Sequence, residues 1–185
     1  PKERGAHHHT RDQVFAEAET GANGRTKGFH IVGGLEMQAG LQYYSDMFRG
    51  LKERHPQVHI KALTAVEIAH ISRIDKTPIE DVLMALREAG LDTLPGGGAE
   101  LFSKGVRATI APKKLNAEHW TEAHRVAPSL GLRHNPTMPS GHVDSYAQRL
   151  QHRSILRASP TRTVGLPPDT PPASHPPHHD TRPAP

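Results

Sequence analysis

Three consecutive glycines followed by a carboxylate are the residues of this sequence best suited to binding a small molecule. They lie in the stretch LDTLPGGGAELF, where Gly96, Gly97 and Gly98 follow a short apolar segment and Glu100 comes two residues later. Glycine allows a positive φ and close approach of the backbone, so its N–H groups could contact a phosphate, a carboxylate or a ribose. A plain tight turn would use the same residues. The stretch matches neither a P-loop nor the GxGxxG fingerprint of dinucleotide sites.

Two further side chains of interest follow predicted strands. Glu67 lies a few residues beyond one apolar segment, as Glu100 does beyond the next, so the two carboxylates could face one pocket. Such a carboxylate can orient a ribose hydroxyl or an amine, and a solvated glutamate at the rim is the alternative. His142, directly after Gly141, is the histidine that we favour as functional. We interpret His30, inside the first predicted strand, as a core histidine.

The other histidines do not predict a metal site. The chain has 15 histidines, among them a triplet at residues 7–9 and three in a proline-rich end, His175, His178 and His179. Three consecutive side chains of a helix or strand cannot point at one ion, so we expect no designed metal centre. No Ser/His/Asp arrangement is recognisable, and the catalytic residues stay unassigned.

The elements that must position these residues alternate between strands and helices. Short apolar runs predict strands near 29–33, 58–63, 91–95 and 132–138, and a helical period predicts helices near 11–19, 41–53, 77–90 and 116–131. The third helix has the strongest signals: Thr77 as N-cap, Pro78 at the first helical position, Glu80 completing a capping box and Gly90 after the last turn. Its apolar stripe consists of Ile79, Val82, Leu83 and Leu86.

This alternation predicts an α/β fold with about four parallel strands and flanking helices, either an open doubly wound sheet or part of a barrel. In both architectures ligands gather at the carboxyl ends of the strands. Glycine-bearing turns follow three of the four strands, at Gly33-Gly34, at Gly96-Gly97-Gly98 and at Gly141. We therefore expect the exposed backbone of these turns to lie on the functional rim.

Composition narrows the possible partners. The net charge is +4 and the sequence pI is about 9.6, but the basic residues form no block, so we expect no nucleic-acid partner. No apolar run approaches the roughly 18 residues of a membrane span, which leads us to expect no membrane partner and a cytoplasmic location. The chain has no cysteine and so no thiolate ligand of its own for a metal or an iron–sulfur cluster.

Four blocks of the sequence, in this order and at this spacing, resemble aminofutalosine synthase, a radical S-adenosylmethionine (SAM) enzyme family of the futalosine route to menaquinone. These blocks are FHIVGGL, VHIKALTAVEI, AGLDTLPGGGAELF and GLRHNPTMPSGHVD, and the similar part covers roughly residues 10–150. The dehypoxanthine futalosine cyclases and the deazaflavin-cofactor synthases are similar in outline. The motifs HIVGG and KALTAVEI favour aminofutalosine synthase over these other families.

The resemblance implies a (βα) barrel of the radical SAM type, with SAM and a [4Fe–4S] cluster as cofactors. In the family, a 5′-deoxyadenosyl radical adds to 3-[(1-carboxyvinyl)oxy]benzoate, and the cofactor carries the hard chemistry. By position, Gly33 and Gly34 match the double glycine that meets the methionine moiety of SAM. The resemblance likewise places Glu67, Gly96, Gly97, Gly98 and Glu100 among cofactor-binding residues, and Asn135 and His142 among substrate-binding residues.

The chain also departs from the family pattern. The CxxxCxxC cluster loop and the first strand have no counterpart, Glu36-Met37 replaces His-Pro after the glycine pair, and Pro128 falls inside a predicted helix. We expect a truncated copy that is inactive on its own, or one completed by a complementing chain. The alternatives are a cyclase-like radical SAM protein, a non-catalytic binding module, or a different α/β enzyme that uses the glycine turn without iron.

Three segments are expected along the chain. Residues 1–28 form an N-terminal segment with one short helix, residues 29–153 form the partial barrel, and residues 154–185 form a tail rich in proline and histidine. The tail has too few apolar residues to form a core, and we expect it to be disordered.

Overall fold

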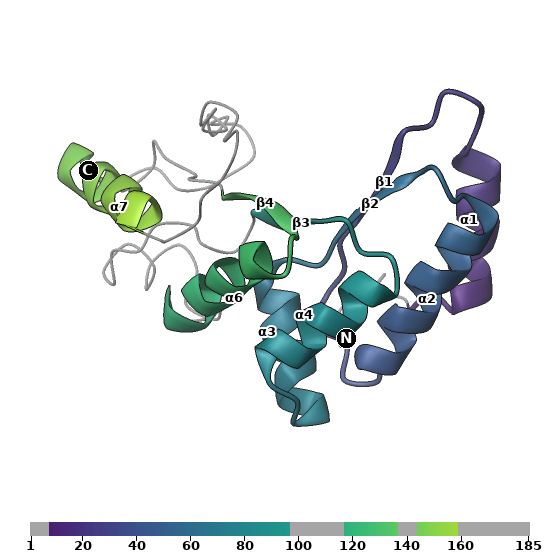
Figure 1. Ribbon diagram of the computed structural model, residues 1–185, viewed down its shortest axis with the longest axis horizontal. Helices are drawn as coiled ribbons and strands as arrows, with labels where there is room; N and C mark the ends of the chain where they lie inside the picture. The colour runs from purple at the N-terminus through teal and green to yellow at the C-terminus, as the bar shows by residue number, and fades with distance from the viewer. Residues whose placement is uncertain (1–7, 97–116, 137–143, 159–185) are drawn as a thin grey trace, which may run out of the picture.

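Short parallel strands joined by helices make up the molecule (Figure 1). The computed structural model describes residues 8–96, 117–136 and 144–158. Within these residues, one sheet contains four strands in the order β1-β2-β3-β4, all parallel. The strands are β1 (Gly28–Ile31), β2 (His59–Ala62), β3 (Thr93–Gly96) and β4 (Arg133–Pro136). The predicted parallel α/β architecture is therefore confirmed.

Six helices are described, and those that lie between successive strands cover one face of the sheet (Figure 1). The six helices are α1 (Arg11–Gly21), α2 (Leu41–Arg54), α3 (Ala65–Asp75), α4 (Ile79–Glu88), α6 (Ala117–Ser129) and α7 (Tyr146–Ala158). Strand order that follows chain order, with helices on one side, is the arrangement of a partial (βα) barrel. None of the described helices is long and apolar enough to cross a membrane.

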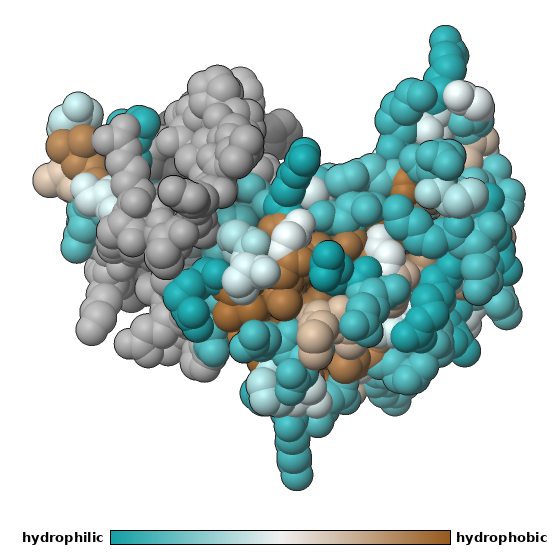
Figure 2. All heavy atoms as spheres, in the orientation of Figure 1, coloured by the Kyte–Doolittle hydropathy of each residue, from teal (hydrophilic) through white to brown (hydrophobic). Residues whose placement is uncertain are grey.

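The core lies between the sheet and these helices. Ile60 and Ala62 of β2 and Leu94 of β3 are buried, whereas the residues that alternate with them on β2, His59 and Lys61, are not. The opposing helices contribute the predicted stripe of α4 together with Phe48, Leu51, Ile68 and Trp120. Figure 2 shows hydrophobic residues gathered over α3, α4 and α6 within a polar surround. One apolar layer therefore holds the helices to the sheet.

Several local predictions need correction. The capping box at Thr77 is wrong, because Pro78 is the N-cap of α4, no side chain caps that helix, and the Thr77 hydroxyl donates to the Asp75 carbonyl at 3.2 Å. The prediction for Gly90 is confirmed, since it follows the last turn with a φ of 115°. Pro128 lies inside α6, one residue before its end.

Two helices were not predicted at all. Helix α3 begins within a segment whose first residues read as a strand, and α7 runs to Ala158, beyond residue 153, where we expected the ordered part to end. The rest of the expected tail lies outside the described residues.

Candidate functional site

The glycine pair after β1 and the start of α3 meet at the carboxyl edge of the sheet. Strand β1 ends at Ile31, and the backbone N–H of Gly33 donates to Glu67 Oε1 at 2.9 Å. Glu67 comes from the first turn of α3, which follows β2 directly. The structure thus brings together three of the predicted site residues, Gly33, Gly34 and Glu67.

Glu67 is held by its own helix as well. It occupies the third position of α3 in a capping box: Glu67 Oε2 accepts from the Thr64 backbone N–H at 2.7 Å and from the Thr64 hydroxyl at 2.8 Å. The residue is only 4% exposed, so the alternative of a solvated rim glutamate is wrong. With three protein donors on its two oxygens, the carboxylate keeps the loop backbone in place rather than facing water.

Helix α3 fastens the loop after β1 at further points. His70 Nε2 lies 3.1 Å from the carbonyl oxygen of Glu36, and Asp75 Oδ2 accepts from the Leu41 N–H at 2.5 Å. These two contacts and the one between Gly33 and Glu67 each join residues 34 positions apart. A constant separation means that the loop runs alongside the helix in the same direction. We call residues 33–41 the glycine loop; side chains of α3 hold it along its length.

The last of these contacts also caps the next helix. Asp75 supplies the acceptor for the first N–H of α2, whose N-cap Gly40 has no side chain to do so. A Cβ on Gly40 would lie 2.7 Å from Asp75 Oδ1, whereas a Cβ on Gly34 would have no atom within 4 Å. The glycine loop is therefore closely packed at its end and open at Gly34.

A strained residue marks the other side of this junction. Leu63, between β2 and the N-cap Thr64, has a φ of 59° although it is not glycine, and it is buried. A branched side chain rarely adopts this left-handed conformation, which costs of order 1–3 kcal/mol. The turn lets α3 start immediately after β2, and this places Glu67 opposite Gly33.

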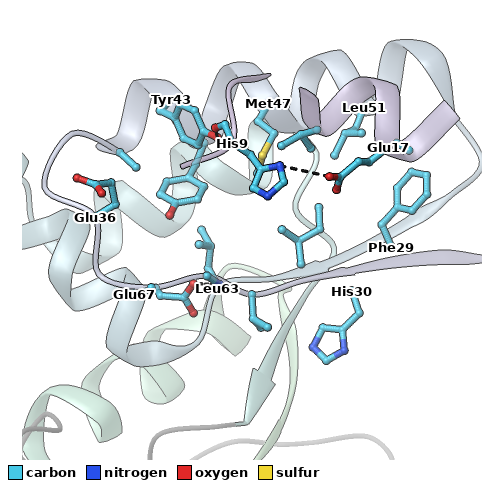
Figure 3. A pocket seen from close by; sticks show the side chains of 18 of the residues that line it. His9, Glu17, Phe29, His30, Glu36, Tyr43, Met47, Leu51, Leu63 and Glu67 are labelled. Carbon is cyan, nitrogen blue, oxygen red and sulfur yellow. Dashed lines mark hydrogen bonds and ion pairs between the residues drawn. The ribbon is translucent and has the colours of Figure 1, made fainter. Parts of the chain in front are cut away.

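A cavity of about 710 Å³ extends from the glycine loop into the space between β1 and helices α1 and α2 (Figure 3). Its inner part is apolar and includes Phe29, Met47 and Leu51, while Gly33, Gly34 and Glu67 line its outer end. Tyr43 also lines it, and its hydroxyl donates to the carbonyl of His9 at 2.8 Å. The cavity thus has polar groups at two places, at the carboxyl edge of the sheet and beside α1, where His9 Nδ1 lies 3.3 Å from Glu17 Oε1 (Figure 3).

The carboxylates near the loop affect a neighbouring phenol. Burial raises the pKa of Tyr44 well above its ordinary value, and the negative charges of Glu67 and Glu36 raise it further. Tyr44 therefore stays neutral at any physiological pH and serves as a packing residue of this site.

The remaining predicted site residues are only partly described. Gly96 ends β3 and pairs with Pro136, and Asn135 pairs with Pro95, so both lie at the same edge of the sheet as Gly33. The side chain of Asn135 is not described, and Gly97, Gly98, Glu100 and His142 lie outside the described residues. His30 is exposed, so its interpretation as a core histidine is wrong. The sequence analysis missed the roles of His70 and Asp75, but Thr64-x-x-Glu67 is a readable capping signal.

The side chains of this chain can be compared with the ligands that the cofactors of the family require. An iron–sulfur cluster needs thiolates, and the 185 residues contain no cysteine, so they do not fit that group. In the part of the chain that the structure describes, no three His, Asp or Glu side chains cluster as a metal site would require. The open backbone at Gly34, by contrast, suits the approach of a small polar ligand.

Curated proteins align with most of the chain. Aminodeoxyfutalosine synthase of Thermus thermophilus is 46% identical over 137 residues, which are 74% of this chain and 37% of that protein. The synthase of Streptomyces coelicolor is 39% identical over 137 residues, 74% of this chain and 35% of that protein. The cyclic dehypoxanthine futalosine synthase of the same organism is 36% identical over 134 residues, 72% of this chain and 34% of that protein. The chain spans little more than a third of the length of these relatives. No protein-family model matches it.

The fold has a counterpart among solved structures. The cobalamin-dependent S-adenosylmethionine radical enzyme OxsB superposes with a TM-score of 0.52 at 13% identity, covering 79% of this chain and 21% of that enzyme. At this identity the likeness concerns the fold alone. Over the aligned residues, the sequence relatives show that the chain is homologous to the aminodeoxyfutalosine synthases.

Proposed function

We propose that this chain forms the SAM-binding rim of a radical SAM enzyme with aminodeoxyfutalosine synthase activity, an activity that needs further chain to be complete. The observation that carries the proposal is the glycine loop. Gly33 of its Gly33-Gly34 pair is held by a buried carboxylate at the carboxyl edge of a parallel sheet, in a chain that matches a curated synthase at 46% identity over 137 residues. Ligands of parallel α/β folds bind at this edge.

The proposal gives each residue a limited role. The open backbone at Gly34 would receive the methionine moiety of SAM, because nothing occupies the space beside its Cα. Glu67 would act as a positioning residue, since its carboxylate is already bonded to Gly33 and Thr64. The turn at Gly96, Gly97 and Gly98 with Glu100 would complete the cofactor site, with Asn135 and His142 on the substrate side.

The chemistry that SAM would supply here, once bound and reduced by one electron, is a 5′-deoxyadenosyl radical for addition to 3-[(1-carboxyvinyl)oxy]benzoate. The reducing cluster requires thiolates that these residues lack, so we place its ligands on a complementing segment or chain. The glycine loop binds and orients SAM, and the side chains of α3 hold this loop in place. The lower identity to the cyclic dehypoxanthine futalosine synthase, 36% against 46%, favours the synthase over the cyclase. We further propose a cytoplasmic location and the three segments 1–28, 29–153 and 154–185, with the end of α7, up to Ala158, at the start of the third segment.

The test is calorimetric titration of the purified full chain with SAM, without iron or reductant. We expect wild type to bind, and Gly34→Val to weaken binding at least tenfold, because the side chain would fill the open space beside the backbone. Gly24→Val is the matched control, since a Cβ there also meets nothing within 4 Å but lies away from the glycine loop. Folding of each variant is checked by circular dichroism. A folded wild-type chain that does not bind SAM, or equal binding by Gly34→Val, would refute the proposed rim.

A further inference from the structure

The face of the sheet turned away from the helices has a row of polar and basic residues. The parallel register places His30 of β1 beside Lys61 of β2, Lys61 beside Thr93 of β3, and Thr93 beside Arg133 of β4. Neighbours in register on parallel strands share a face, and alternate residues such as Ile60 and Leu94 are buried under the helices. Figure 3 shows His30 on the opposite side of β1 from Phe29 and Met47.

The basic side chains of this row have no counter-charge in the described part of the chain. No described carboxylate lies within 4.0 Å of the charged atoms of Lys61 or Arg133, and neither residue makes a hydrogen bond with a described residue. Lys61 is nonetheless half-buried. Lys52, which is also half-buried, has a partner in Asp92 at 2.7 Å. The row thus has positive charge available for a ligand.

Asp92, the residue before Thr93, already has hydrogen-bond partners of its own. Asp92 Oδ2 accepts from Lys52 Nζ and, at 2.7 Å, from the N–H of Ile60. Burial alone would raise the pKa of Asp92, but these hydrogen bonds and the charges of Lys52 and His59 outweigh it and lower the pKa. The charge of Asp92 is balanced by Lys52, so among the described residues Lys61 and Arg133 have no carboxylate partner.

The spacing of Lys61, Thr93 and Arg133 on adjacent strands, and the hydrogen-bond donors that they carry, are suited to binding one compact anion. Adjacent strands lie roughly 5 Å apart, so Lys61 and Arg133 flank Thr93 on either side, and their long side chains can converge above its hydroxyl. The Thr93 hydroxyl lies 2.8 Å from His59 Nε2, on the same face. When His59 donates that hydrogen bond, the hydroxyl proton of Thr93 is free to point at a ligand.

We propose that Lys61, Thr93 and Arg133, with His59 behind the threonine, bind a single carboxylate or phosphate group of a small molecule. Two cations and a hydroxyl around one point are the donor set that such a group needs. From this row the strand direction leads to the glycine loop, three residues or roughly 10 Å further along β1. A small molecule anchored by its anion here reaches the carboxyl edge with its other end. The site does not depend on SAM binding or on the proposed activity.

The experiment titrates the full chain with sodium benzoate and, separately, with inorganic phosphate at constant ionic strength, following the imidazole Cε1–H resonances of His59 and His30 by NMR. We expect saturable shifts with at least one probe, weakened at least tenfold in Lys61→Met and in Arg133→Gln. Saturation by benzoate alone identifies a carboxylate ligand, and saturation by phosphate alone identifies a phosphoryl ligand.

Two controls remove the same charge from the helices, Lys76→Met after α3 and Arg87→Gln on α4, and should bind as wild type does. Circular dichroism checks that each variant folds, and Thr93→Val provides an independent variant that keeps all charges. Shifts that do not saturate with either probe would overturn the proposal. Equal loss of binding in the row variants and in the controls would also overturn it, since this would show general charge attraction only.

Discussion

Buried polar side chains around α3 and those between α6 and β4 have opposite environments. Glu67 and His70 are 4% and 8% exposed, and each has a polar partner on the glycine loop. His124 of α6 is 2% exposed, and neither of its ring nitrogens has a hydrogen-bond partner among the described residues. The nitrogens of His134 on β4 likewise have none there, and the two rings contact each other tilted by 51°, with centroids 4.6 Å apart.

The two regions differ in whether their buried polar side chains stabilise or destabilise the fold. A buried polar group destabilises unless it is hydrogen-bonded, and a bonded one specifies which backbone groups lie together. Around α3, polar groups therefore fix the geometry of the glycine loop. Between α6 and β4, His124 contributes its ring to packing against Trp120, at 4.0 Å between centroids, while its nitrogens weaken the fold. Three predictions test this contrast.

Removing the carboxylate of Glu67 should have the largest effect. Glu67→Ala leaves the N–H groups of Gly33 and Thr64 without their acceptor at a partly buried junction, and we expect the free energy of unfolding to fall by about 2–4 kcal/mol. Urea denaturation measures it. Glu80→Ala, at an exposed position in the first turn of α4, is the control and should change stability by less than about 0.5 kcal/mol. Similar values for both variants would mean that the hydrogen bonds of Glu67 do not stabilise the fold.

Acid should destabilise the α6–β4 region through its histidines. Burial lowers the pKa of His124 from 6.5 to about 3, with a further lowering from His134, whose own pKa burial also lowers. Between these two pH values the unfolded chain binds a proton that folded His124 does not. Protonation of His124 in the unfolded chain therefore does not lower the free energy of unfolding above pH 6.5. Between pH 6.5 and about pH 3 it lowers this free energy by about 1.4 kcal/mol for each pH unit.

His124→Phe is the variant that isolates this effect. It keeps a ring beside Trp120 and removes two buried nitrogens, so we expect the free energy of unfolding at pH 7.5 to rise by about 1 kcal/mol. Its decline with falling pH should be shallower than that of wild type. Denaturation series at several pH values measure both. A loss of stability in His124→Phe at pH 7.5 would show that His124 is satisfied after all and would remove the contrast.

Substitutions within the glycine loop should change the stability of the fold least. The difference between them should show which end of the loop is closely packed. In Gly40→Ala the new Cβ meets the Asp75 carboxylate at 2.7 Å, which disturbs the cap of α2 and should lower stability by about 1 kcal/mol. Gly34→Ala points into open space and should leave stability within about 0.5 kcal/mol of wild type. Thermal unfolding of the two variants compares them directly. A more destabilised Gly34→Ala would mean that the loop is packed where we describe it as open.

Much of the architecture was predictable because it depends on local patterns. The apolar stripe of α4 and the glycine that ends it follow from the helical period and from the positive φ that glycine tolerates, and both predictions are confirmed. Helix α3 could have been predicted from Thr64-x-x-Glu67, a capping signal that directly follows the predicted strand and that we did not interpret as a helix start. The N-cap prediction at Thr77 was wrong because the sequence allows a helix to begin at either Pro78 or Ile79. In the structure, α4 begins at Ile79, with Pro78 as its N-cap.

The sequence by itself therefore determined the alternation of strands and helices, the family, and the glycine pair as a candidate ligand contact. Each of these depends on residue type over a short window. Only the tertiary structure decided that Glu67 bonds Gly33 and is not solvated, that His30 is exposed, and that Lys61 and Arg133 flank one threonine. These relations join residues some 30 or more positions apart, and strand register and helix placement set them through packing that no local pattern contains.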